Sequence, residues 1–524
     1  MSLSTANSIE PPGAVGADVQ ARTLSVVLPL LVLLGAFLRF YRLGGQSLWV
    51  DEILTLKAAN VGGTLALRDV LSNIQGPLHA VLVHFVARFS TSEPALRGLS
   101  ALAGVATIPV VYLLGKDVAG RRVGLISATL IAVSPFAVWY SQEVRNYSFL
   151  ILLSATSTLA AWRIIVTGGR AWGLYAASVT LALYSNLSAA FLWLAHTLFG
   201  LGRLARARRL MKWAATCLAI ALLFLPLLLG LIKWVEVDCV GERIVVAPLA
   251  ENGELLRGAT TFSPLAIPYS IFTMVYGYSL GPSARELHTG SPLGAFARHL
   301  WLVIPAGVMA AVGFILGFRR LWVEGSAGRL VAAVVVVSFL AAAVLALLNI
   351  KPFNVRYVAV MLPVIVVTMS AGVATLSVRR GAWLWAGVVL FSLLSLGRYY
   401  FVPEYSREDV RGAARYVAEN ERPGDIVLVP VVRDVFAFYY EGAADYFAVY
   451  RGQTASADRL RSVVEARAEG HERLWFVESR LWHMDEALRT PIVLGELYRE
   501  VDRREFAGAT VTLYDLDERP DTGR

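Results

Sequence analysis

The sequence predicts a mainly helical membrane protein, with a bundle of about eleven transmembrane helices followed by a small soluble α/β domain. Three observations point to this class. First, 56% of the 524 residues are hydrophobic and only 17% are charged, which is more apolar surface than a soluble fold can bury. Second, the apolar residues gather in runs of roughly 17–22, the length of a helix that crosses a membrane. Third, these runs stop near residue 402, and the rest of the chain is rich in charge.

Eleven segments are expected to cross the membrane. Ten apolar runs are long enough to cross alone, and a shorter run at 172–185 also has to cross for the loops to alternate between the two sides. The segment 77–89 differs, because it has about 13 residues and contains three basic or imidazole side chains, so we expect a helix at the membrane surface. The ten long runs lie near residues 24–40, 97–115, 123–140, 147–166, 187–202, 213–234, 299–318, 329–348, 356–376 and 381–399.

The basic residues set the orientation, because cytoplasmic loops carry an excess of Lys and Arg. If 77–89 does not span and the N-terminus is cytoplasmic, every basic cluster between spans falls inside; counting 77–89 as a span would put all of them outside. We therefore expect a multi-pass protein of the cell (inner) membrane with a cytoplasmic tail at 1–23 and an extracytoplasmic active site. The outward parts are the first loop 41–96, the short loop 141–146, the long loop 235–298, the loop 349–357 and the tail from 403.

The membrane-spanning part is expected at 24–402 and the soluble domain at 403–524. In the soluble part, a helix is predicted over Arg407–Asn420. Strands are predicted after the turn at Pro423-Gly424, from Arg473 and from Ala509, where short apolar and β-branched runs follow turn residues. A helix with several strands indicates an α/β domain.

Composition and motifs disfavour several functions. The net charge is +9, but the basic residues lie in short loops between apolar runs, so the lipid bilayer is the expected partner and nucleic acid is not. The sequence has no Walker loop, dinucleotide fingerprint or nucleophile elbow. The two cysteines, Cys217 and Cys239, flank a predicted span, which places them far beyond the reach of a disulfide.

A protein-held metal site is also not expected. His79 and His84 are five residues apart, a spacing that does not place both on one face of a helix. No certain cofactor follows from the residues, although a divalent cation held by Asp51, Glu52 or Glu143 together with a phosphate is compatible with them.

Asp51 and Glu52 form an acidic pair just after the first apolar run. Carboxylates beside a bilayer are costly and are usually retained for chemistry or charge. One interpretation is that a carboxylate caps a helix beginning near Ile53, where negative charge is favourable. The other is catalytic, since a partly desolvated carboxylate can act as general base toward an acceptor hydroxyl or amine.

Two arginines at the outer ends of predicted spans accompany the acidic pair. Arg145 lies in the segment Gln142–Tyr147, and Arg356 lies between Lys351 and Tyr357. Each arginine either anchors its span at the membrane surface or holds a phosphate through the forked hydrogen bonds of a guanidinium. Arg and Lys are the usual side chains that stabilise a departing phosphate.

With these residues assembled, the chain resembles the GT-C superfamily of membrane glycosyltransferases, and within it the branch of protein O-mannosyltransferases and the lipid A aminoarabinose transferase. The segment 38–52, ending in Asp51-Glu52, is similar to the acidic motif of the first loop in that branch. The segment 75–79 stands where the branch has a Pro-Pro-Leu motif, residues 96–147 follow its second and third spans, and Val355-Arg356-Tyr357 resembles its later arginine motif. The chain departs from the pattern at Gln75-Gly76, which replaces a polar residue and a proline, and at Asn186, where related chains often carry His.

The resemblance implies the GT-C fold and an inverting transfer of a hexose or pentose from a polyprenyl-phosphate donor to an extracytoplasmic acceptor, which is a glycan, a lipid or a protein. Asp51 or Glu52 would be the general base, and Arg145, Arg356 and Lys351 would bind the donor phosphate. The remaining polar residues of these motifs would line the substrate or acceptor pocket: Gln75, His79, Gln142, Glu143, Tyr147 and Tyr357.

Two other functions are compatible with a polytopic chain. A transporter or lipid-carrier flippase usually shows repeated halves with charges at the midplane of the membrane. Here the charges collect on one face and no repeat is visible, which favours the transferase. A sensor or assembly factor would use the soluble tail as a binding module.

Overall fold

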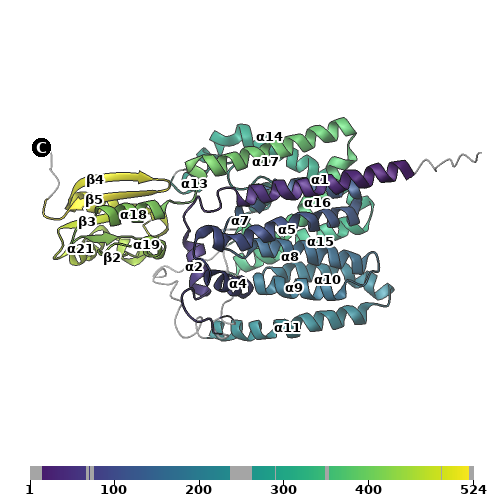
Figure 1. Cartoon of the computed structure of the whole chain (residues 1–524), viewed down its shortest axis with the longest axis horizontal. Helices are drawn as coiled ribbons and strands as arrows, with labels where there is room; N and C mark the ends of the chain where they lie inside the picture. Colours follow the sequence, from purple (N-terminus) through teal and green to yellow (C-terminus); the bar gives the residue numbers. More distant parts are fainter. Residues whose placement is uncertain are drawn as a thin grey trace, which may run out of the picture.

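The computed structural model describes residues 14–66, 70, 76–236, 262–289, 291–348, 353–485 and 487–518. The chain has two parts, a bundle of long helices and a C-terminal α/β domain at one end of that bundle (Figure 1). The fold class predicted from the sequence is therefore confirmed.

Each of the eleven segments predicted to span corresponds to a helix or to a pair of consecutive helices. Among the described residues, seven helices are long and apolar enough to cross a membrane, and a bent pair makes eight, so the number eleven stays a prediction. The helices are α1 (Ala14–Phe40), α5 (Glu93–Ala119), α6 (Arg121–Ala132) with α7 (Pro135–Ser141), α8 (Tyr147–Ile165), α9 (Trp172–Ser185), α10 (Ala189–Arg206), α11 (Leu210–Glu236), α14 (Pro292–Val323), α15 (Ser326–Leu347), η2 (Val355–Met361) with α16 (Leu362–Thr375), and α17 (Val378–Phe401).

The bend between α6 and α7 has a local cause in the sequence. The two helices meet at 53° around Ser134-Pro135. Proline has no backbone N–H and cannot continue the helix that precedes it, but it suits the first turn of a new one. The hydroxyl of Ser134 accepts a hydrogen bond from the Ala137 N–H at 3.2 Å and so begins α7. The loop 142–146 follows directly and carries Arg145.

The described part of the first outer loop includes two short helices, α2 (Val50–Ala58) and α4 (Pro77–Ala87). The predicted helix start near Ile53 is wrong, because the carboxylate of Glu52 accepts the Trp49 N–H at 3.2 Å and caps a helix that already begins at Val50. Helix α4 has 11 residues, too short to cross a bilayer, as expected for 77–89. The long outer loop also contains helices, α12 (Ala266–Tyr276) and α13 (Ala284–Thr289), and its residues 237–261 lie outside the described residues.

The C-terminal domain is built on a five-stranded sheet with the order β2-β1-β3-β5-β4. Strand β1 is parallel to β2 and β3, whereas β5 is antiparallel to β3 and β4. The strands are β1 (Ile426–Leu428), β2 (Asp445–Phe447), β3 (Arg473–Ser479), β4 (Arg499–Phe506) and β5 (Ala509–Asp515). The helices are η3 (Pro403–Tyr405), α18 (Val410–Asn420), α19 (Arg433–Tyr439), α20 (Arg451–Thr454), α21 (Ala457–Ala468), η4 (Leu481–His483) and α22 (Arg489–Leu497).

The predicted helix from Arg407 begins three residues later than expected. The carboxylate of Asp409 accepts the Gly412 N–H at 2.9 Å and caps α18, so Arg407 lies before the helix in extended chain. The three predicted strands correspond to β1, β3 and β5. Strands β2 and β4 were not predicted, because β2 has three residues and β4 carries charged side chains on both faces.

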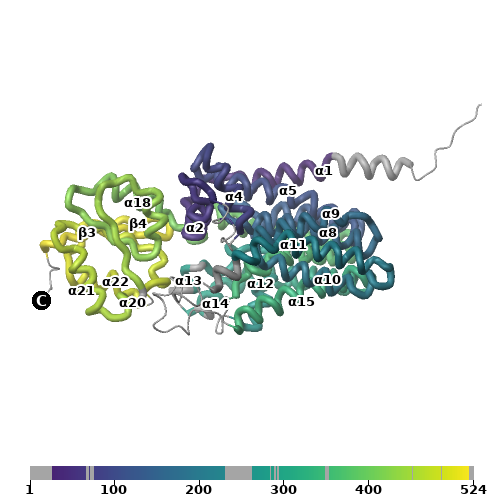
Figure 2. The backbone as a smooth tube through the Cα atoms, turned by 90° about the horizontal axis from the view of Figure 1, so that it is seen from below, coloured from purple at the N-terminus to yellow at the C-terminus, as the bar shows by residue number. Residues whose placement is uncertain are grey.

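The C-terminal domain packs against the first outer loop (Figures 1 and 2). Leu48 and Ile53 of this loop belong to the same buried apolar cluster as Val410 and Trp475 of the domain. Polar contacts extend this interface: the Lys57 ammonium lies 2.5 Å from an Asp434 oxygen, the Arg411 guanidinium lies 2.7 Å from a Glu93 oxygen, and the Leu48 N–H donates to the Tyr439 hydroxyl at 2.8 Å. Helix α2 therefore lies between the bundle and the domain.

Candidate active site

Asp51 lies in the first turn of α2, between two guanidinium groups from distant parts of the chain. An Nη1 atom of Arg356 lies 2.5 Å from Oδ2 of Asp51, and an Nη2 atom of Arg145 lies 3.9 Å from the same oxygen. The Asp51 side chain is 19% exposed, so a bound molecule can reach it. The structure thus brings together an acidic residue and the two arginines that the sequence placed on one side of the membrane.

Arg145 is held by contacts of both its side chain and its backbone. Its Nη1 donates to the Asp51 carbonyl at 3.0 Å and to the Thr55 hydroxyl at 3.1 Å, which locks it along α2. The Ser100 hydroxyl donates to the Arg145 carbonyl at 3.1 Å. The centres of the Arg145 and Arg356 guanidinium groups each lie 5.9 Å from the centroid of the Tyr147 ring, so this ring forms an aromatic wall beneath both cations.

Arg356 lies on the 3₁₀ turn η2, where the chain enters α16. The Asn354 side chain accepts the Arg356 N–H at 3.1 Å and begins this turn. The guanidinium centre lies 5.5 Å from the Tyr357 ring centroid, which adds a second aromatic neighbour. Arg356 is 23% exposed in its side chain, so, like Asp51, it is accessible.

Glu52, the neighbour of Asp51, has a different environment because its side chain is fully buried. Arg97 of α5 binds it with a fork, from Nε to Oε1 at 2.9 Å and from Nη2 to Oε2 at 2.8 Å. The Val144 N–H donates to Oε1 at 2.7 Å, and Nη1 of Arg407 lies 3.4 Å from Oε2. Burial alone would raise the pKa of Glu52, but the two arginines and the Val144 amide hold it below its ordinary value. Glu52 is an ionised carboxylate saturated with donors.

Glu143 lies beside this network and lacks such donors. Its side chain is buried, and its Oε1 lies 3.1 Å from Nη2 of Arg407, in a geometry that gives neither carboxylate oxygen a hydrogen bond. Burial raises the pKa of Glu143 to about 7, against the attraction of Arg407. Glu143 therefore exchanges a proton near neutral pH.

Two residues assigned to the substrate pocket from the sequence, Gln142 and His79, have buried side chains that contact other parts of the bundle. The Gln142 amide donates to the carbonyls of Arg39 and Tyr41 at 3.1 and 2.8 Å, at the C-terminal end of α1. His79 is buried, and its Nε2 lies 3.3 Å from the Ser100 hydroxyl. Burial and the nearby Arg145 lower the pKa of His79 to about 3, so its imidazole is neutral.

The backbone conformation and the close packing at position 76 explain why glycine stands there before α4. Gly76 has φ +122°, a conformation that favours glycine. A Cβ at this position would lie 2.3 Å from Nδ2 of Asn146 and 2.6 Å from the Ser185 carbonyl. The Asn146 amide in turn donates to that carbonyl at 2.5 Å. The departure at Gly76 therefore allows α4 to pack closely on the end of the 142–146 loop.

Two further predicted site residues, Gln75 and Lys351, lie outside the described residues. Within the described ranges, no three His, Cys, Asp or Glu side chains gather in a way that could hold a metal ion. A divalent cation that enters with a phosphate stays a prediction.

Sequence reasoning missed two arginines that support the site, Arg97 and Arg407. Arg97 had a usable signal, since an arginine in the first turns of a long apolar helix needs a partner if it is buried. Arg407 had none, because its contacts to Glu52 and Gln142 join residues 355 and 265 positions apart.

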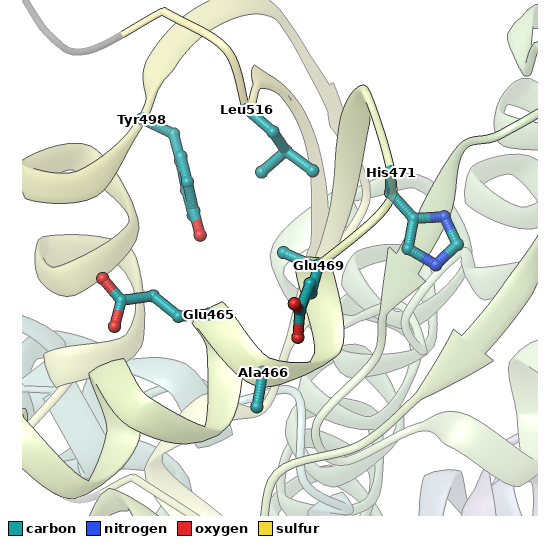
Figure 3. Close-up of a pocket in the computed structure, with 7 residues that line it drawn as sticks. Glu465, Ala466, Glu469, His471, Tyr498 and Leu516 are labelled. Carbon is teal, nitrogen blue, oxygen red and sulfur yellow. The ribbon is translucent and has the colours of Figure 1, made fainter.

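A separate pocket of about 390 Å³ opens on the C-terminal domain (Figure 3). Tyr498 and Leu516 lie across from the end of α21, which carries Glu465 and is followed by Glu469. His471 at its edge is bound to the Gly424 carbonyl at 2.8 Å. The described residues that line this pocket include neither Lys nor Arg, and none of them belongs to the site around Asp51.

Comparison with known proteins supports the fold. A family model described as dolichyl-phosphate-mannose-protein mannosyltransferase matches residues 75–231. No curated protein matches the chain in sequence.

Three solved structures are similar over most of their length. ArnT from Cupriavidus metallidurans in the apo state is 12% identical with a TM-score of 0.57, over 94% of this chain and 98% of that one. The same protein bound to undecaprenyl phosphate is 12% identical with a TM-score of 0.54, over 92% and 97%. The archaeal oligosaccharyltransferase AglB from Archaeoglobus fulgidus, in complex with an inhibitory peptide and a dolichol-phosphate, is 14% identical with a TM-score of 0.53, over 96% and 75%. The resemblance seen in the sequence is therefore confirmed: nearly the whole chain has the fold of the GT-C membrane glycosyltransferases, and residues 75–231 match one of their families.

Proposed function

We propose that the chain is an inverting glycosyltransferase that moves a sugar from a polyprenyl-phosphate donor to an extracytoplasmic acceptor. One observation carries the proposal: an accessible carboxylate, Asp51, lies against two arginines, Arg145 and Arg356, in a GT-C fold. Related folds support the donor class, since one solved structure contains undecaprenyl phosphate and another contains a dolichol-phosphate.

In this mechanism, Asp51 is the general base and Glu52 is structural. The Asp51 carboxylate takes the proton of an acceptor hydroxyl or amine while the acceptor atom bonds to the anomeric carbon. The bond between that carbon and the phosphate oxygen breaks, and its electron pair leaves with the polyprenyl phosphate. One displacement inverts the anomeric configuration. Glu52 cannot share the role of Asp51 without giving up its hydrogen bonds to Arg97 and Val144.

The arginines bind the departing phosphate. Arg356 pairs with Asp51, and a donor phosphate offers this cation a second anion. Phosphate binding would thus draw Arg356 away from Asp51 and leave the base free to accept a proton. Arg145, fixed on α2 and Tyr147, supplies positive charge that needs no reorganisation during the reaction.

The site fits a transferase better than a transporter or a flippase. The charged groups gather around Asp51 on α2. Helix α2 lies at the end of the bundle that faces the C-terminal domain (Figure 1). The basic loops between spans support an extracytoplasmic location for this end.

The test compares Asp51→Asn with Asp434→Asn, a matched change in the exposed ion pair that joins Asp434 of the C-terminal domain to Lys57 of α2. In a deletion strain complemented with each variant, mass spectrometry follows lipid-linked sugars and envelope glycans. We expect Asp51→Asn to let the donor accumulate and to lose about 10²–10⁴-fold in transfer, since that is the usual contribution of a general base. Asp434→Asn should restore wild-type glycans.

Purified Asp51→Asn protein is then tested with undecaprenyl phosphate in a thermal-shift assay. Retained stabilisation with lost transfer would support the role of Asp51 as base. Full glycosylation by a stably inserted Asp51→Asn protein would refute it.

A further inference from the structure

We infer that Arg407, at the start of the C-terminal domain, is a positioning residue of the active site. It fixes the 142–146 loop, and this loop holds Arg145 beside Asp51. The catalytic consequence of this inference rests on the proposed transferase function. The C-terminal domain is then part of the catalytic scaffold.

The first support is the way the 142–146 loop is held. Arg407 Nη1 donates to the Gln142 carbonyl at 2.9 Å, the Val144 N–H donates to Glu52 at 2.7 Å, and the Ser100 hydroxyl donates to the Arg145 carbonyl at 3.1 Å. Three groups from three separate regions therefore hold three of the five residues of one short loop. Only Arg407 among these three comes from beyond the last membrane helix.

The second support is the position of Arg407 itself. It lies between η3 and α18, and its side chain is 3% exposed. Its backbone N–H donates to the Gln46 side chain at 3.2 Å, and the carbonyl of the next residue, Glu408, accepts a hydrogen bond from the Ser47 hydroxyl. The guanidinium centre lies 5.7 Å from the Trp139 ring centroid on α7. This segment is thus fixed both to the first outer loop and to the bundle.

The third support is charge balance. Arg97 is engaged with Glu52 by two hydrogen bonds, so in the described part of the chain Arg407 is the cation that forms an ion pair with Glu143. Without Arg407, Glu143 would lose its ion pair, and Glu52 would keep, among the described residues, only its pair with Arg97. Ionised Glu143 would then be repelled, and the loop on which it lies would move. The titratable or charged groups that face Glu143 are Arg407, Glu52, Asp51, Arg145 and the phenols of Tyr140, Tyr278 and Tyr399.

The experiment uses the full-length protein in lipid nanodiscs and compares wild type with Arg407→Gln, Arg407→Lys and the double variant Arg407→Gln/Glu143→Gln. The matched control is Arg473→Gln, because Arg473 forms a buried fork with Asp425 inside the same domain, at 2.9 and 2.6 Å. This control reports what a general weakening of the domain does.

Hydrogen exchange is the first readout, because it does not depend on activity. We expect Arg407→Gln to speed exchange of peptides covering 142–146 by about tenfold or more, and Arg473→Gln to leave them unchanged while it speeds exchange in β1 and β3. Unchanged exchange of the 142–146 loop in Arg407→Gln would overturn the inference.

The pH dependence of transfer is the second readout. Removing Arg407 raises the pKa of Glu143 further, because Arg407 is the main group that lowers it. We therefore expect Arg407→Gln to lose little kcat near pH 6, where Glu143 is protonated, and about tenfold at the alkaline end of the pH range, where Glu143 ionises, while the KM for the acceptor changes little. Adding Glu143→Gln should remove the extra loss at high pH, and Arg407→Lys should retain part of the wild-type rate. If Arg407→Gln lost the same share of kcat at every pH, and if adding Glu143→Gln did not restore kcat, the charge of Glu143 would have no role in this loss.

The two proposals fail in different ways. If wild type transfers no sugar from polyprenyl donors, the proposed function fails, and the exchange of the 142–146 loop still decides the role of Arg407. If wild type is active and that exchange is unaffected by Arg407→Gln, the positioning role alone is wrong.

Discussion

Asp51 and Glu52 are adjacent in the sequence, yet they belong to two different regions of the molecule. Asp51 lies in an open region with Arg145 and Arg356, where a substrate can reach it. Glu52 lies in a sealed region with Arg97, Arg407 and the Val144 amide. Neighbouring residues on a helix point about 100° apart, so one turn of α2 supplies a carboxylate to each region.

The difference separates chemistry from scaffolding. Charges in the sealed region have no access to solvent, so each must be neutralised by a partner, and the loss of any one affects folding. Charges in the open region exchange partners with water or with a substrate, and their loss affects the reaction more than the fold. The predictions below test this division, from the largest expected effect to the smallest.

The sealed region gives the largest expected effect. Replacing Arg97 with Met keeps most of its volume but removes both forked hydrogen bonds to the buried Glu52 and leaves it Arg407 as its ion-pair partner, 3.4 Å away, so we expect the folded state to lose about 3–5 kcal/mol. Thermal unfolding of the purified protein in detergent measures this loss. The control is Arg163→Met. Arg163 forms an ion pair with Asp117 at 2.7 Å, but its side chain is 36% exposed, so we expect the loss of this pair to cost about 1 kcal/mol or less. Equal losses in the two variants would contradict the division.

The open region is expected to respond in the opposite way. Arg356→Gln removes a cation from the donor phosphate, so transfer should fall by about 10²–10³-fold while the melting temperature changes little. Stabilisation by undecaprenyl phosphate should weaken in parallel. Arg356→Lys should recover part of both, because it restores the charge without the fork. A variant that melts much earlier than wild type would instead place Arg356 among the structural charges.

The open region was predictable from sequence, whereas the sealed one largely was not. Hydropathy and the positive-inside rule placed Asp51, Arg145 and Arg356 at the same ends of different spans, and this coarse geometry was enough to expect that they meet. The sequence could not decide whether Asp51 or Glu52 is the accessible carboxylate, because that depends on where α2 begins. The Glu52 carboxylate accepts the Trp49 N–H, and the helix therefore begins at Val50.

The fold follows the same rule. Long apolar runs predicted the bundle helices, because their signal is local and strong. The edge strand β4 was missed because its side chains are exposed on both faces and show no alternation. The contact between Arg407 and the 142–146 loop depends on how the C-terminal domain docks, and no local pattern in the sequence encodes that arrangement.

The smallest expected effect lies at the border of the two regions, at Glu143. Its pKa is raised from 4.5 to about 7, so its proton is bound more tightly in the folded protein than in the unfolded chain. The stabilising contribution of the protonated carboxyl is fully present below pH 4.5 and is lost as the pH rises to about 7. Glu143→Gln cannot ionise, so we expect it to match wild type near pH 4.5 and to be more stable above pH 7.

Melting temperatures of wild type and Glu143→Gln between pH 4.5 and 8.5 measure this difference. The control is Glu496→Gln, in an exposed pair with Arg461, which should follow the wild-type curve throughout. A constant gap between wild type and Glu143→Gln would mean that Glu143 keeps one charge state over this range, and Glu143 would then belong wholly to the sealed region. A gap that opens between pH 4.5 and 7 would show that the scaffold contains a carboxyl which titrates under physiological conditions. The ion pair with Arg407 of the C-terminal domain would then lower the free-energy cost of ionising Glu143.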